Sequence, residues 1–152
     1  MPFSLKNYIR GAIRAGGLRF RICEDPFIYL DKNYVAMLGG IRKALISVTE
    51  FEDRLKVIQL KTHGEKLADE SKVAVRYGAN ILMIDTGRKG DITTVSRTLR
   101  KAGLRSKVKL AYAGNIELRD IPKLQKEDLD MVDIGRAIVD APLLDMRLEV
   151  VR

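Results

Sequence analysis

The chain has 152 residues, a formal net charge of +8, a single cysteine and no apolar stretch long enough to span a bilayer. Its length suits one domain with a sizeable core, but a complete eight-unit (β/α) barrel usually needs about 200 residues or more, so any barrel formed here is incomplete. The lone Cys23 excludes internal disulfides and Cys-rich metal sites and suits a reducing cytosol, so we expect a cytoplasmic protein without membrane contact.

The first 22 residues are expected to form a basic, amphipathic helix followed by a strand. Lys6, Arg10 and Arg14 recur every four residues opposite an apolar face, which predicts a helix over residues 4–15. Leu18–Ile22 alternates arginine with apolar residues, as a half-exposed strand does. A basic helix of this kind can lie on a membrane or on RNA, but we favour one that covers an open edge of the domain with its basic face in water.

From residue 23 to residue 152, apolar runs alternate with helical patterns, which predicts β/α units and a mostly parallel sheet. One helical pattern continues from Leu38 to Val48, and a later one ends at Gly78. We therefore expect a single α/β domain, an incomplete, open TIM-like (β/α) barrel with a sheet of about six strands. The expected strands are Phe27–Asp31, Lys56–Lys61, Asn80–Asp85, the two runs that break at Gly114 and at Gly135, and Met146–Val151.

Two of these strands break at a glycine ahead of a helix: Gly114 is followed by Asn115, and Gly135 by Arg136. Where parallel strands lead into such loops, free backbone N–H groups form an anion site, and (β/α) barrels often bind phosphate in the loops after their last two strands. We therefore expect these four residues to bind a phosphate group. The alternative is that both glycines only turn the chain out of a strand.

Charged side chains at the other strand ends are candidates for chemistry. Asp85 ends an all-apolar strand, where it can hold Mg²⁺ with a pyrophosphate, orient a lysine, act as a base or cap its own loop. Lys61 can meet Asp85 across neighbouring strands, as a phosphate clamp, an amine nucleophile or a plain ion-pair partner. His63 is the only histidine, and we expect it to be structural.

The chain resembles the C-terminal barrel of the quinolinate phosphoribosyltransferase family, which makes nicotinate mononucleotide. VKLAYAGNI is similar to the family's phosphate-loop strand, IGRAIVDAPLLDMRLEV to its closing segment, and ILMID to the strand whose terminal aspartate binds metal and phosphoribosyl diphosphate. The resemblance spans nearly the whole chain. It implies a catalytic and metal-binding role for Asp85, phosphate-loop roles for Gly114 and Gly135, and substrate contacts for Arg21 and Lys32.

Several groups of that family are missing here. Its Thr-Arg-Lys-Thr motif has no match, and its His-Arg pair corresponds to Phe20 and Arg21. Its Lys-Asp-Asn-His motif corresponds to Asp31–Tyr34, with the lysine displaced and the histidine lost, and its glutamate-rich strand reads Ile58–Lys61. These changes remove most of the quinolinate clamp and part of the metal site. The resemblance therefore implies a diverged barrel that binds a phosphorylated small molecule and converts quinolinate poorly.

A second resemblance covers residues 83–137. MIDTGRKGD and AGNIELRDIPKLQKE are similar to the (5-formylfuran-3-yl)methyl phosphate synthase family, a barrel that condenses triose phosphates through active-site lysines. It implies catalytic roles for Asp85 and Lys89, although that family's Arg-Gly pair is inverted here as Gly135-Arg136. A third alternative is a non-catalytic interaction or regulatory protein. RNA binding is disfavoured because no aromatic cluster for base stacking is present.

We also expect the chain to assemble with other copies. A sheet of about six strands cannot close an eight-stranded barrel, and open parallel edges with apolar faces need cover. A homodimer or larger oligomer is therefore expected, with another chain supplying missing residues. The abundance of Lys, Arg and Glu over Gln and Asn favours a thermophilic source. Mg²⁺ is the cofactor we consider, a phosphorylated small molecule is the expected ligand, and nucleic acid is not an expected partner.

Overall fold

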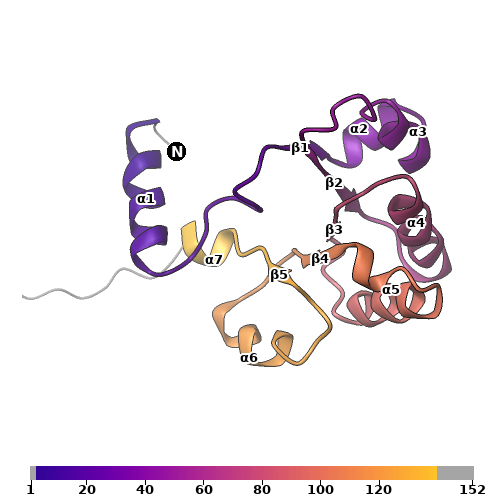
Figure 1. The fold of residues 1–152 in the computed structure, drawn as a ribbon. Coiled ribbons are helices and arrows are strands. Elements are labelled where there is room, and N and C mark those ends of the chain that lie inside the picture. The colour runs from indigo at the N-terminus through magenta and orange to yellow at the C-terminus, as the bar shows by residue number, and fades with distance from the viewer. Residues whose placement is uncertain (1–2, 140–152) are drawn as a thin grey trace, which may run out of the picture.

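The computed structural model describes residues 3–139. Within them, five parallel strands form one sheet in sequence order. Figure 1 shows the strands along an arc that is open on the side of the N-terminal helix α1 (Phe3–Ala15), so the sheet is the wall of an unclosed, TIM-like barrel. The strands are β1 (Phe27–Leu30), β2 (Leu55–Leu60), β3 (Ile81–Ile84), β4 (Lys109–Tyr112) and β5 (Met131–Val132).

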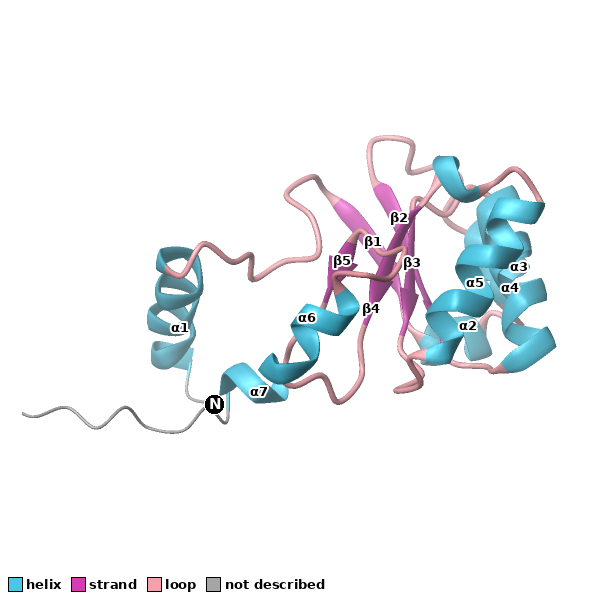
Figure 2. Ribbon diagram, turned by 90° about the horizontal axis from the view of Figure 1, so that it is seen from below, coloured by secondary structure: helices cyan, strands magenta, loops and turns pink. Residues whose placement is uncertain are grey.

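Helices follow the strands, and α2 to α5 lie together on the convex face of the sheet (Figure 2). None of the helices in residues 3–139 is long and apolar enough to cross a membrane. The helical elements after α1 are α2 (Lys32–Met37), α3 (Ile41–Ile46), α4 (Gly64–Arg76), α5 (Gly90–Lys101), the 3₁₀ turns η1 (Arg105–Lys107) and η2 (Leu118–Asp120), α6 (Ile121–Leu124) and α7 (Arg136–Val139).

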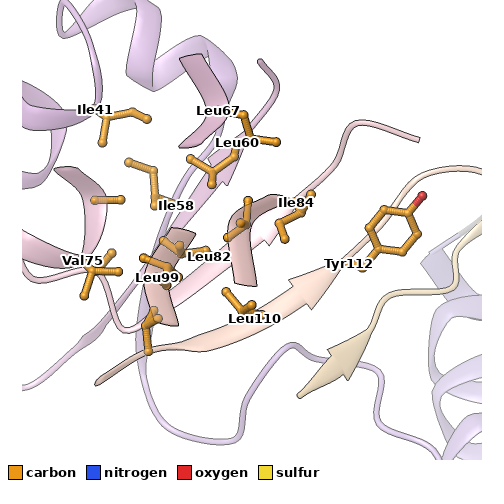
Figure 3. Packing of buried hydrophobic residues seen from close by; sticks show 14 of the residues in the cluster. Ile41, Ile58, Leu60, Leu67, Val75, Leu82, Ile84, Leu99, Leu110 and Tyr112 are labelled. Atoms are coloured by element: carbon orange, nitrogen blue, oxygen red, sulfur yellow. The ribbon is translucent and has the colours of Figure 1, made fainter. Parts of the chain in front are cut away.

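The main hydrophobic core lies between the sheet and these helices. Ile58, Leu82 and Leu110 stand in register on β2, β3 and β4, and all three are fully buried (Figure 3). Leu67 of α4 and Leu99 of α5 belong to the same cluster and are also fully buried. Burying one such side chain contributes about 1.5–3 kcal/mol, so this layer supplies much of the driving force for folding.

The concave face of the sheet carries a smaller cluster. Because β3 is buried on both faces, its sequence is apolar throughout, as is usual for a parallel strand inside a sheet. Cys23 packs against this cluster as a half-buried side chain, and burial raises the pKa of its thiol. The buried members are Val57, Ile81, Met83, Ala111 and Ala113, and the partly buried ones are Ile22, Cys23, Phe27 and Met131.

The N-terminal segment differs from the prediction in two respects. Residues 18–22 do not form a strand, and Ile22 instead packs on the concave face. The helix α1 forms as expected but lies apart from the sheet in both views and contributes to neither core cluster (Figures 1 and 2). Its side chains Arg10 and Arg14 stack on Phe20, at 5.0 and 4.6 Å from the ring centre. Tyr8 remains 77% exposed, so α1 does not cover the sheet edge within this chain.

The described residues contain five of the about six expected strands, and the expected strand Met146–Val151 lies outside those residues. One further expectation is corrected. The helical pattern from Leu38 to Val48 is not one helix. Gly39 and Gly40 adopt φ values of +78° and +111°, which interrupt the helical backbone and separate α2 from α3.

Candidate functional site

A hollow of about 240 Å³ lies at the carboxyl ends of β3, β4 and β5. We call it the strand-end hollow. The four residues predicted to bind phosphate and the predicted Asp85 all line it, and Asp133 is a lining residue that the sequence analysis did not single out. The lining residues are Asp85, Ala113, Gly114, Asn115, Ile116, Asp133, Gly135 and Arg136.

Strand register brings the two lining carboxylates to one row of the sheet. The ladder of backbone hydrogen bonds continues one residue beyond the strands: the Ala113 N–H donates to the Ile84 carbonyl, and the Asp133 N–H donates to the Tyr112 carbonyl, both at 2.9 Å. Asp85, Ala113 and Asp133 therefore follow one another across three strands on the concave side. Because the middle residue is an alanine, space is left between the two carboxylates.

The loop after β4 approaches the loop after β3 closely at Gly114. Its φ is +109°, and a Cβ placed there would lie 3.0 Å from the Gly87 backbone nitrogen and 3.2 Å from Asp85 Oδ1. Only glycine fits this position without strain. Gly135 is different, because its φ is not left-handed and a Cβ there would meet nothing within 4 Å. The steric requirement for glycine therefore lies at Gly114, and the phosphate contact of Gly135 stays a prediction.

Two side chains hold Asp85, one on β2 and one directly after that strand. Gln59 Nε2 donates to Asp85 Oδ2 at 2.6 Å, and Lys61 Nζ lies 2.7 Å from the same oxygen. The Gln59 Oε1 in turn accepts a hydrogen bond from the Lys32 backbone N–H at 2.8 Å, at the first turn of α2. The structure thus brings Lys61 and Asp85 together as an ion pair, and it adds Gln59, which lies two residues before Lys61 on the same strand face.

Negative charge accumulates at the strand-end hollow. Desolvation raises the pKa of Asp133, and the nearby Asp85 carboxylate raises it further. On β1, burial raises the pKa of Tyr29 to about 12, with further contributions from Asp85, Asp133 and Asp31. Within residues 3–139, no hydrogen bond or ion pair engages the Asp133 carboxylate. The hollow therefore combines two glycine-containing loops with an exposed carboxylate that lacks a cationic partner among the described residues.

The other predicted site residues take part in other contacts. The Lys89 ammonium pairs with Asp120 Oδ1 at 2.6 Å, and the catalytic role that the second resemblance implies for Lys89 stays a prediction. The Arg21 guanidinium stacks over the ring of Phe27, the first residue of β1, at 5.6 Å from the ring centre. The exposed Lys32 contributes its backbone N–H to Gln59. None of these three residues lines the strand-end hollow.

His63 makes a polar contact with Asp91. Its Nδ1 lies 2.8 Å from Oδ2 of Asp91, a buried carboxylate in the first turn of α5. The pair joins the loop before α4 to the start of α5, which agrees with a structural role for the histidine. Asp91 was not singled out by sequence because an acidic residue in a first helical turn is ordinary.

The side chains at the strand-end hollow offer few ligands for a metal ion. In the described part of the chain, no group of three or more His, Cys, Asp or Glu residues could hold one. Mg²⁺ often binds through one or two carboxylates together with substrate phosphates, so Asp85 could serve only with a bound ligand. The Lys61 ammonium, however, already lies 2.7 Å from Asp85 Oδ2, and a metal ion would have to displace it. The Mg²⁺ role of Asp85 stays a prediction.

Comparison with known proteins identifies the family. Residues 4–149 match the model of the quinolinate phosphoribosyl transferase C-terminal domain. The chain is 26% identical over 137 residues to a probable nicotinate-nucleotide pyrophosphorylase [carboxylating] of Archaeoglobus fulgidus, covering 90% of this chain and 51% of the relative. It is 24% identical over 149 residues to a protein of the same description from Methanothermobacter thermautotrophicus, covering 96% of this chain and 52% of the relative.

Solved structures show the same fold. NadC from Streptococcus pyogenes matches with a TM-score of 0.72 and 19% identity, over 90% of this chain and 45% of that one. The nicotinate-nucleotide pyrophosphorylase of Francisella tularensis matches with a TM-score of 0.64 and 27% identity, over 84% of this chain and 42% of that one. The chain spans about half the length of the curated relatives it matches. It belongs to the quinolinate phosphoribosyltransferase C-terminal domain family.

Proposed function

We propose that this chain binds the phosphate group of a small molecule in the strand-end hollow, as a diverged, phosphoribosyltransferase-like barrel. The observation that carries this proposal is the convergence of two glycine-containing loops and one arginine on a single hollow at the carboxyl ends of parallel strands. Parallel β/α sheets bind ligands at this end, and loop N–H groups with a guanidinium are suited to a phosphate oxygen. The carboxylating pyrophosphorylase activity named for its relatives is consistent with a phosphorylated ligand.

The proposed roles divide between the two loops and β2. Gly114, Asn115 and Gly135 would offer backbone N–H groups to the phosphate, and Arg136 would add charge. Lys61, held by Asp85 at 2.7 Å, would lie at the edge of the hollow nearest the rest of the ligand. Because the sequence lacks the clamp residues of the family, we propose binding with poor quinolinate conversion by this chain alone. Losing one preorganised group typically costs on the order of 10²-fold in rate.

The test is a calorimetric titration of inorganic phosphate, ribose 5-phosphate and nicotinate mononucleotide. We expect wild type to bind at least one of the two organic phosphates more tightly than inorganic phosphate. Arg136→Ala should weaken that binding by about tenfold or more, since a hydrogen bond to a charged group contributes about 1.5–3 kcal/mol. Arg97→Ala is the matched control, because Arg97 is an exposed arginine on α5 and does not line the hollow.

Circular dichroism must show that each variant is folded. If folded wild-type protein binds none of the three compounds at millimolar concentration, the glycines only turn the chain. That result would favour the alternative of a non-catalytic interaction protein. The same titration with Mg²⁺ tests the metal prediction for Asp85: a requirement for the ion would support it. Release of carbon dioxide from quinolinate and phosphoribosyl diphosphate by the purified chain would contradict the expected poor conversion.

We also propose a homo-oligomer. The sheet of residues 3–139 is not closed. Three apolar side chains in and just after α1 are exposed: Leu5 (47%), Tyr8 (77%) and Leu18 (52%). Open parallel edges and exposed apolar side chains need cover, and a second copy would provide both. Light scattering at micromolar concentration is the measurement, and Tyr8→Asp should shift the species toward a monomer. A monomeric wild type would contradict the proposal. Cytoplasmic location and a thermophilic source stay predictions.

A further inference from the structure

We propose that the ligand of the strand-end hollow carries an amino or similar cationic group beside its phosphate, and that Asp133 selects for this group. This inference rests on the proposed function, because it concerns the part of the same ligand that lies beyond the phosphate. The inference starts from two observations. Asp133 lines the strand-end hollow, and the Lys61 ammonium pairs with Asp85 and not with Asp133.

The geometry leaves room for a small charged group between two carboxylates. Asp85, Ala113 and Asp133 continue β3, β4 and β5 in one row, as their backbone hydrogen bonds show. Neighbouring strands lie about 4.8 Å apart, so the Cα atoms of the two aspartates are separated by about 10 Å with only an alanine methyl group between them. An ammonium group placed over Ala113 lies within reach of both side chains.

The charges are not balanced within the hollow. Lys61 pairs with Asp85 at 2.7 Å, and Gln59 donates to the same Asp85 oxygen, so that carboxylate is already satisfied. Arg136 lines the side formed by the phosphate-binding loops. Asp133 is an exposed residue whose carboxylate has no such partner in residues 3–139. Desolvation and, after it, the nearby Asp85 charge raise the Asp133 pKa, so a ligand cation would relieve the repulsion between the two carboxylates.

The same charges disfavour a purely anionic ligand. A second carboxylate on the ligand would face Asp133 directly, and like charges in a partly desolvated hollow repel. A hydroxyl group could donate one hydrogen bond to the Asp133 carboxylate, but it would bring no positive charge to offset the two negative side chains. An ammonium group would form charge-assisted hydrogen bonds to the Asp133 carboxylate, which are shorter and about twice as strong as neutral ones. The expected ligand class is therefore an aminated phosphate ester.

The experiment compares two probes that differ in one group: ethanolamine phosphate and 2-hydroxyethyl phosphate, with the pair 3-aminopropyl phosphate and 3-hydroxypropyl phosphate for longer reach. Calorimetry at pH 7 gives the affinity ratio within each pair. We expect wild type to favour the amine by about tenfold or more in at least one pair. Asp133→Asn should bring that ratio close to one while leaving the hydroxyl compound bound at least as tightly.

Asp53→Asn is the control, since Asp53 is an exposed aspartate between α3 and β2, at the opposite end of the strands. It should keep the wild-type ratio. Equal affinity for amine and hydroxyl compounds, or an amine preference that survives in Asp133→Asn, would overturn the inference and leave the phosphate site standing. Binding of neither compound, nor of inorganic phosphate, would remove both proposals.

A metal ion is the competing explanation for the carboxylates, and the same titrations with Mg²⁺ separate the two. If the hydroxyl compounds bind only with Mg²⁺ and Asp133→Asn abolishes that binding, Asp133 serves a metal and the inference fails. If Mg²⁺ leaves the amine preference of wild type unchanged, the carboxylate recognises the ligand cation directly.

Discussion

Replacing Gly114 by alanine tests whether the two loops of the strand-end hollow depend on their close contact. The new Cβ would lie 3.0 Å from the Gly87 nitrogen and 3.1 Å from its Cα, so backbone rather than a flexible side chain has to move. A φ of +109° adds strain for any residue with a Cβ. An unfavourable backbone conformation costs about 1–3 kcal/mol, and overpacking costs a similar amount, so we expect Gly114→Ala to lose about 2–4 kcal/mol of stability.

Urea unfolding followed by circular dichroism measures this loss. With a slope of about 2 kcal/mol per molar urea, the midpoint should fall by about 1–2 M. Gly135→Ala is the matched control, because its Cβ meets nothing within 4 Å and its φ is not left-handed. The free energy of unfolding of that variant should lie within about 1 kcal/mol of the wild-type value. Any change should be a gain in stability, because alanine lowers the conformational entropy of the unfolded chain. Equal midpoints for the two variants would refute the reasoning about Gly114.

Three further predictions concern the core, the charged network beside β4 and the pair at Asp85. Leu82→Ala removes a fully buried side chain of β3 and should cost about 2–5 kcal/mol in urea unfolding, whereas a loss under 1 kcal/mol would contradict the packing described. Hydrogen bonds from Arg100, Ser96 and Arg105 hold the pKa of Asp128 well below its usual range, so its stabilisation is present at neutral pH and is lost as the pH falls through that depressed pKa. Asp128→Asn should therefore cost about 1–3 kcal/mol at pH 7, a difference that shrinks below pH ~4, and a pH-independent difference would argue against the ion pairs. Lys61→Met should weaken binding of organic phosphates without unfolding the protein, because the lysine is exposed, and unchanged titrations would remove it from the site.

Local sequence determined the β/α units of this protein. The four residues of β3 are apolar because the strand is buried on both faces, and this pattern is visible without a structure. The break of each strand into a polar loop is equally local, so the sequence alone predicts that Asp85, Gly114 and Gly135 lie at the same end of the sheet. Alternation along one strand decides which face a residue takes, and parallel strands share their direction.

The tertiary structure decided how these strand ends combine. The register between β2 and β3 places Gln59 and Lys61 on one oxygen of Asp85, and the register between β4 and β5 adds Asp133 to the same row. Register depends on packing between elements far apart in the chain, so a single sequence does not reveal it. The same holds for α1, whose amphipathic pattern predicted a helix but not its separation from the sheet. Helix formation depends on neighbouring residues, whereas the surface that a helix covers depends on the whole fold.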